Sequence, residues 1–215
     1  MRTHAALPIL AVALATGAGC VSLKRTQEAR FFVLRSVAEP PAAAAPDARR
    51  GFVGVMPVRL PGHLDRPQLV TWTAPGELRI DEFQRWGEPL DTGLTRTLAE
   101  NLGTLLPEHF VARSPWRSSA VPRCRVITDL RVFGLQANGE VRLDGRWALL
   151  PAQGEQSLAR GSASLSRGPL ASGPTGVDPG AEVEAMSELV AELSREIAAA
   201  VRALPDEPKD APPAP

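Results

Sequence analysis

The sequence has 215 residues and a balanced charge, with 24 lysines and arginines against 24 aspartates and glutamates. Because the chain carries no net charge, no long-range field draws it to nucleic acid or to anionic lipid. Its length is enough for one sizeable hydrophobic core, so we expect a single folded domain.

The amino terminus is typical of an export signal. Arg2 precedes an uncharged run, Leu7–Gly19, that ends in small residues directly before Cys20. A membrane-spanning helix needs about 20 apolar residues, so this run is too short and we interpret residues 1–19 as a signal peptide. Cys20 after small residues predicts a bacterial lipoprotein signal with an acylated thiol. Gly17 departs from the usual Leu, Val or Ile, and an ordinary cleaved signal or an uncleaved anchor are the alternatives.

Composition then divides the rest of the chain. Residues 20–29 are polar and form the expected tether, and residues 30–204 form the expected domain. The stretch Pro40–Pro46 predicts an extended linker or a surface loop. Residues 205–215 are rich in proline and predict a disordered tail.

Apolar patterning predicts an α+β domain with a mixed or antiparallel sheet. The first four expected strands lie at residues 31–34, 52–58, 68–73 and 77–83. The segment 52–58 is nearly all apolar, which indicates a strand covered on both faces and therefore central in its sheet.

Two amphipathic helices are expected to pack on this sheet. Leucines recur every three or four residues over residues 89–106, and Pro107 ends that helix. The second helix covers residues 179–204, with Asp178 placed to cap it and Pro179 at its first position. Its polar face is expected to be acidic and exposed, and consists of Glu182, Glu184, Glu188, Glu192 and Glu196.

A β-hairpin is predicted around Asn138-Gly139, between strands at residues 123–135 and 140–150. This dipeptide favours a type I′ turn, in which both central residues have positive φ. The resulting register pairs Ala137 with Glu140, and it places Leu130 opposite Trp147, Thr128 opposite Leu149 and Val132 opposite Gly145. A third strand is expected over residues 156–166, with small Ala159, Gly161 and Ala163 on the side where a helix packs closely.

The sequence lacks the usual signatures of catalysis and metal binding. His63 and His109 are far apart and have no second histidine or cysteine at zinc-ligand spacing. There is no Gly-x-Ser-x-Gly elbow, no phosphate-binding glycine loop and no Cys-x-x-Cys motif. Cys124 lies on the apolar side of its strand and is expected to be a small buried residue, with a redox or metal role as the alternative. We therefore expect no enzyme, no metal and no cofactor beyond a lipid on Cys20.

Two segments, residues 60–70 and 83–90, combine arginine, tryptophan and charged side chains. Arginine and tryptophan are common anchors of protein interfaces. The interface candidates are Leu64, Asp65, Arg66, Pro67, Arg85, Trp86 and Glu88. The alternative is a structural corner, with an Asp65–Arg66 pair holding the turn and Trp86 covering the start of the first helix.

These segments resemble the ABC-type transport auxiliary lipoproteins, the family of paraquat-inducible protein C (PqiC). The most specific matches are Asp65-Arg66-Pro67-Gln68 and Arg85-Trp86-Gly87-Glu88-Pro89-Leu90. Further matches are Gly54 to Val58 with Leu60-Pro61, Leu69-Val70, Asn101-Leu102, Gly139 to Trp147, Ala185 to Ser187 and Leu193 to Ala198. His63 and Cys124 depart from the pattern, since both stand where the family has tyrosine.

The resemblance implies a lipoprotein at the periplasmic face of the outer membrane, anchored by acyl chains such as palmitate. Its partner would be a protein with MCE domains, similar to PqiB, that carries phospholipid or other hydrophobic molecules between two membranes. Family members are expected to be non-enzymatic and to assemble as homo-oligomeric rings. An envelope hydrolase and a soluble lipid carrier are the competing hypotheses. A carrier needs a closed apolar cavity of several hundred Å³.

Overall fold

A computed structural model describes residues 27–41, 51–116, 121–174 and 176–205. The expected signal peptide, Cys20, most of the tether and residues 206–215 of the tail lie outside these ranges. So do residues 42–46 of the expected linker. The interpretations of those segments therefore remain predictions.

The predicted α+β fold is confirmed, and its largest sheet has five strands. In spatial order these are β5 (Phe110–Arg113), β2 (Phe52–Val55), β6 (Cys124–Leu135), β7 (Val141–Leu150) and β8 (Ala159–Arg167). β2 pairs in parallel with β5 and β6, whereas β6, β7 and β8 are antiparallel, so the sheet is mixed. β2 is interior, as its apolar sequence predicted. β5 was not predicted, because four residues are too few to show a clear alternation.

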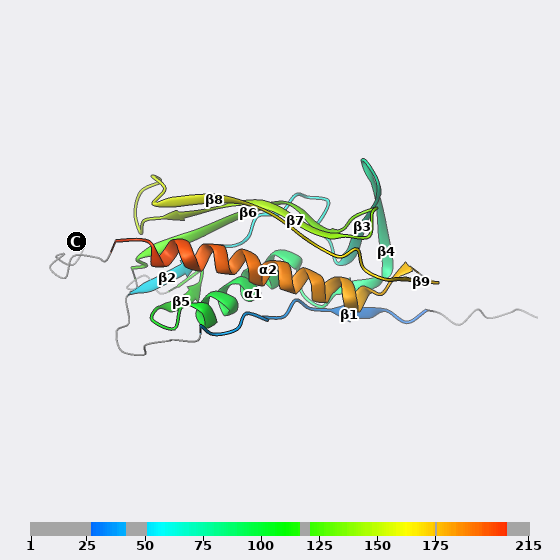
Figure 1. Cartoon of the computed structure of the whole chain (residues 1–215), viewed down its shortest axis with the longest axis horizontal. Coiled ribbons are helices and arrows are strands. Elements are labelled where there is room, and N and C mark those ends of the chain that lie inside the picture. The colour runs from blue at the N-terminus through cyan, green and yellow to red at the C-terminus, as the bar shows by residue number, and fades with distance from the viewer. Residues whose placement is uncertain (1–26, 42–50, 117–120, 175, 206–215) are drawn as a thin grey trace, which may run out of the picture.

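Both predicted helices are present and cover the same face of this sheet (Figure 1). They are α1 (Leu90–Leu105) and α2 (Pro179–Arg202). The Asp178 carboxylate accepts a hydrogen bond from the backbone N–H of Ala181, so the predicted cap is confirmed. α2 also contacts β8, where the sequence predicted close packing. Gly161 makes room there for the Trp147 ring, since an added Cβ would lie 2.6 Å from it.

A second sheet contains β1 (Arg30–Phe32), β4 (Glu77–Trp86) and β3 (Gln68–Ala74), in that spatial order. β3 and β4 form an antiparallel hairpin, and β1 adds to β4 in parallel. This hairpin stands at one end of the molecule, beside the start of α2 (Figure 1). Two short strands, β9 (Ser172–Gly173) and β10 (Gly176–Val177), precede α2 and were not predicted.

The chain after β1 is fastened to both helices. Buried Asn101 of α1 accepts hydrogen bonds from the Ser36 hydroxyl and from the backbone N–H groups of Val37 and Ala38. The N–H of Arg35 donates to the Ser187 hydroxyl on α2. Each such bond contributes about 1 kcal/mol, so β1 and the chain beside it are held firmly against the core.

The predicted β6–β7 register is wrong. Gln136 N–H donates to the Glu140 carbonyl, which leaves residues 137–139 as a three-residue loop. Only Gly139 has a positive φ, of 82°, so the turn is not type I′ but the kind in which a glycine follows a type I turn. A bulge at Arg131 then shifts the pairing again, and Thr128 lies opposite Trp147. Leu130 lies opposite Gly145, and Val132 lies opposite Asp144.

The bulge also changes which β6 side chains face inward. Cys124, Thr128 and Leu130 are buried as predicted, but beyond the bulge Phe133 takes the inward position predicted for Val132. An extra residue in one strand moves every later side chain to the opposite face. The sequence does not reveal this shift, because Arg131 resembles any other outward-facing residue of the strand.

The expected acidic face of α2 requires one correction, at Glu182. This carboxylate is 4% exposed, whereas it was predicted to lie in solvent. Burial raises its pKa to about 7, although the Leu135 backbone N–H and Arg79 both lower it. Glu184, Glu188 and Glu192 do lie at the surface, where they form ion pairs with arginines.

Candidate docking surface

The two candidate interface segments lie side by side because the β3–β4 hairpin joins them. The Pro67 carbonyl accepts a 2.7 Å hydrogen bond from the backbone N–H of Trp86. Gln68 lies opposite Arg85 in the same hairpin. Together the segments line one hollow of about 360 Å³, formed by Asp65, Arg66, Pro67, Trp86, Gly87, Glu88, Pro89 and Leu90.

Backbone hydrogen bonds hold the turn before β3. Leu64 N–H donates to the Pro61 carbonyl, and Arg66 N–H donates to the Leu64 carbonyl. No salt bridge joins Asp65 to Arg66 among the described residues, so that pair does not hold the turn. The Leu64 side chain is buried and fixes the turn to the core, while Asp65 is exposed at its tip.

Leu64 and Trp86 lie in the hydrophobic core, so they support the surface from below and contribute little contact area of their own. Trp86 belongs to the same core cluster as Leu90, the first residue of α1, and both line the hollow. The more exposed interface candidates are Asp65, Arg66, Pro67 and Arg85.

Glu88 is engaged within the chain. Its Oε1 atom accepts hydrogen bonds from Arg96 Nη2 at 2.7 Å and from Arg96 Nε at 3.1 Å. The same guanidinium donates to the Leu34 carbonyl and to Glu100. The Glu88 contact raises the pKa of Arg96. Glu88 thus joins the edge of the hollow to α1 and to the chain after β1.

Arg66 and Arg85 differ from Arg96 in having no such partner. The Nε atom of each is buried and makes no hydrogen bond within the described chain. Neither guanidinium forms a salt bridge with any described residue. A shielded N–H group without an acceptor costs about 1–3 kcal/mol, so both arginines are placed to gain from an acceptor on another molecule.

Apolar side chains adjoin these arginines. Phe31 lies opposite Arg85 in the β1–β4 pairing and is 65% exposed, and Val33 is 49% exposed. Phe83 lies two residues before Arg85 on β4 and is 36% exposed. We call Phe31, Val33, Phe83, Arg85, Asp65 and Arg66 the docking surface. The sequence analysis missed Phe31 and Val33, since their exposure depends on β1 lying at the edge of its sheet.

Residues 32–198 match the model of the family described as ABC-type transport auxiliary lipoprotein component. The match covers most of the chain. The chain belongs to this family.

Solved structures share the fold of this auxiliary lipoprotein. One, described as an uncharacterized protein, is 22% identical with a TM-score of 0.63, covering 81% of this chain and 99% of the other. Another is protein XCC0632 from Xanthomonas campestris, 16% identical with a TM-score of 0.63, covering 79% of this chain and 93% of the other. No curated protein matches the chain.

The auxiliary lipoprotein shows no cluster of catalytic or metal-binding groups in its described part. His63 packs edge-on against Trp72, with ring centroids 5.1 Å apart, and His109 is buried after α1. No group of three or more His, Cys, Asp or Glu side chains among the described residues is arranged to hold a metal ion. Neither described helix is long and apolar enough to cross a membrane.

Proposed function

We propose that this auxiliary lipoprotein is a non-enzymatic anchoring and docking subunit of an MCE-type intermembrane transport system. It is held at the periplasmic face of the outer membrane by acyl chains on Cys20. The observation that carries this proposal is the family match over residues 32–198, joined to a lipoprotein-type signal that ends at Cys20.

Acyl chains are a sufficient anchor for such a protein. Each buried CH₂ group contributes about 0.8 kcal/mol, and two or more chains give stable attachment where one does not. The chain between Cys20 and Gln27 spans at most about 25 Å when fully extended. The end of the domain at β1 therefore stays close to the lipid headgroups.

The occupant that we propose for the docking surface is a second copy of this chain, in a ring that presents its end to the MCE protein. Exposed aromatic side chains beside arginines that lack an acceptor are typical of the centre of a protein interface. The family resemblance supports a closed ring, in which every copy uses this surface in the same way.

Crosslinking in cells followed by purification of the tagged protein tests this function. We expect a protein with MCE domains to be recovered together with crosslinked copies of this chain. The Cys20→Ala variant is the control, since it should leave the membrane and lose the MCE protein. Recovery of neither product from wild-type cells would contradict the proposal.

A further inference from the structure

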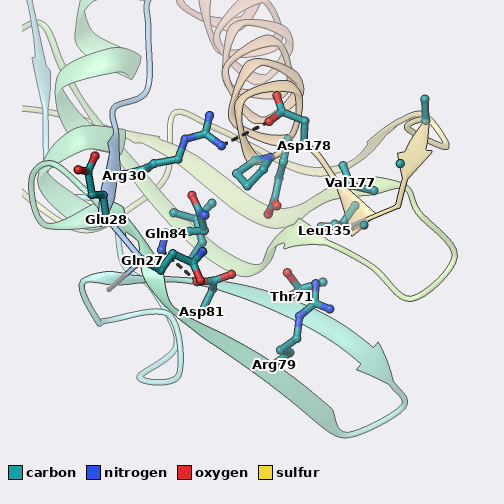
Figure 2. Close-up of a pocket in the computed structure, with 16 residues that line it drawn as sticks. Gln27, Glu28, Arg30, Thr71, Arg79, Asp81, Gln84, Leu135, Val177 and Asp178 are labelled. Atoms are coloured by element: carbon teal, nitrogen blue, oxygen red, sulfur yellow. Dashed lines mark hydrogen bonds and ion pairs between the residues drawn. The ribbon is translucent and has the colours of Figure 1, made fainter. Parts of the chain in front are cut away.

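A second pocket, of about 700 Å³, lies at the end of the domain where the tether enters (Figure 2). Its walls come from β1, the β3–β4 hairpin, the end of β6, the β9–β10 turn and the start of α2. We call it the tether pocket, since Gln27 and Glu28, the first described residues, form part of its rim. It is separate from the docking surface, whose residues do not line it.

The two most buried polar side chains of the tether pocket both present acceptor oxygens, and the Gln84 amide also carries N–H donors. Glu182 lines the pocket from α2 and is 4% exposed. Gln84 lines it from β4, is 8% exposed, and its Oε1 atom has no hydrogen-bond partner among the described residues. A buried carbonyl oxygen without a donor costs about 1–3 kcal/mol, so the pocket is built to receive a group that donates hydrogen bonds.

The outer groups of the pocket include two guanidinium groups. The Arg30 side chain is 54% exposed and lies 3.7 Å from Asp178, which is also largely exposed. Arg79 is exposed on β4, and its charge acts on Glu182. Figure 2 shows Arg30, Gln84 and Arg79 around the same space. Two guanidinium groups and the carboxylates of Glu28, Asp81 and Asp178 thus form the outer part of the pocket, and the Glu182 carboxyl and the Gln84 carbonyl oxygen lie deeper.

This order of groups fits a ligand with an ammonium at its end and a phosphate behind it. The ammonium has three N–H donors. The Glu182 carboxyl oxygens and the Gln84 amide oxygen can accept hydrogen bonds from them. Arginine at the mouth is suited to a phosphate, because guanidinium binds phosphate oxygens in pairs. A plain amine, such as a lysine side chain, gives no counter-charge to Arg79, which forms no salt bridge with a described residue, whereas Arg30 already lies beside Asp178. We propose that the tether pocket binds the phosphoethanolamine group of a membrane lipid.

A membrane lipid is the source that fits the position of the pocket, and this step rests on the proposed Cys20 anchor. In a phosphoethanolamine headgroup the ammonium is the outermost group and the phosphate lies nearer the bilayer. A headgroup that enters ammonium first therefore leaves its phosphate at the mouth and its acyl chains outside. A choline headgroup cannot bind in the same way, because its quaternary nitrogen has no N–H to donate to the Gln84 oxygen.

Calorimetry on the full lipidated protein in maltoside micelles tests the ligand chemistry. The probe is sn-glycero-3-phosphoethanolamine, compared with sn-glycero-3-phosphocholine, sn-glycerol 3-phosphate and free ethanolamine. We expect saturable binding of the first probe, at least tenfold tighter than that of each of the others. Equal affinities for glycerophosphocholine and glycerophosphoethanolamine, or no binding of either compound, would overturn the proposal.

Two variants connect the binding to named groups. Gln84→Met removes the acceptor at similar volume and should weaken probe binding about tenfold or more, while Gln156→Met, outside the pocket, should not. Since the Gln84 oxygen has no partner among the described residues, the melting temperature of Gln84→Met should be equal to or higher than that of wild type.

If that variant unfolds, Arg79→Gln provides the second test, since the exposed Arg79 side chain can change without loss of the fold. It should weaken binding of the glycerophosphoethanolamine probe but not that of free ethanolamine, which loses a repulsive charge, and an unchanged probe affinity would overturn the phosphate assignment.

Nanodiscs distinguish a lipid source from a soluble one. Anchored in discs that contain phosphatidylethanolamine, the protein should bind the soluble probe at least tenfold more weakly than in discs of phosphatidylcholine, because the lipid occupies the pocket. Equal probe affinity in both discs would overturn the lipid source. The micelle experiment needs neither an MCE partner nor a bilayer, so its result does not depend on whether the protein recovers an MCE partner.

Discussion

Glu182→Gln should separate the cost of the buried carboxylate from its contribution to packing. Glutamine has nearly the shape of glutamate and can still accept the Leu135 N–H, but it cannot ionise. Burial raises the Glu182 pKa from 4.5 to about 7. The folded protein therefore holds this proton more strongly than the unfolded chain does, and wild-type stability falls as pH rises between these two values.

The size of the effect follows from that shift. One pKa unit corresponds to about 1.4 kcal/mol, so the carboxylate costs about 3 kcal/mol once pH exceeds both values. Between pH 5 and pH 8 the free energy of unfolding of Glu182→Gln should therefore gain about 2–3 kcal/mol over that of wild type. The charged groups that line the pocket around Glu182 are Glu28, Arg30, Arg79, Asp81 and Asp178. They are unchanged in the variant, so the difference isolates Glu182.

Urea unfolding at both pH values, followed by circular dichroism, measures the difference directly. Glu196→Gln is the matched control, since this glutamate lies on the same helix, is partly exposed and forms no salt bridge with a described residue. The control should show no pH-dependent difference from wild type. A difference between Glu182→Gln and wild type that stays constant from pH 5 to pH 8 would refute the reasoning, because the carboxyl would then not titrate in this range.

Three further substitutions test the anchor, the docking surface and the sheet. Cys20→Ala should move the protein from the membrane fraction to the soluble fraction with an unchanged melting temperature, and retention on membranes would contradict acylation. Arg66→Glu should lower the oligomer mass measured by light scattering and change unfolding by less than about 1 kcal/mol, since Arg66 is only half-buried; intact oligomers with a large loss of stability would favour a structural role. Gly161→Val should destabilise by about 1–3 kcal/mol, measured by urea unfolding, because an added Cβ meets the Trp147 ring, whereas Gly62→Ala should cost less.

Sequence periodicity predicted the long elements of this fold because each has a repeating apolar pattern. The leucine spacing of α1 and the Asp178-Pro179 start of α2 both define helices by local chemistry. The β6–β7 register could not be predicted in the same way. It depends on whether the loop has two or three residues and on the bulge at Arg131. In each case the observed pairing differs little in free energy from the alternative pairing.

The docking surface was predictable in part. Two strands around the turn at residues 74–76 bring the start of one and the end of the other together, so the sequence held a signal, missed in the sequence analysis, that Pro67 and Trp86 lie close to each other. Burial of Leu64 and exposure of Phe31 depend on how the second sheet meets the helices, and a single strand pattern does not determine that. Glu182 had a signal that was missed. It lies four residues before buried Met186 and hence on the same helix face.

The stability cost and the proposed ligand of the tether pocket have one physical origin. Glu182 is held away from water and the Gln84 oxygen has no donor among the described residues, and each of these features is unfavourable. A primary ammonium satisfies both groups at once, although they lie on different elements, α2 and β4. Glu182→Gln and Gln84→Met remove these unfavourable features and should stabilise the protein. The same two substitutions should therefore weaken binding of the glycerophosphoethanolamine probe. If either variant gains stability and still binds glycerophosphoethanolamine as wild type does, the two groups do not form the binding site.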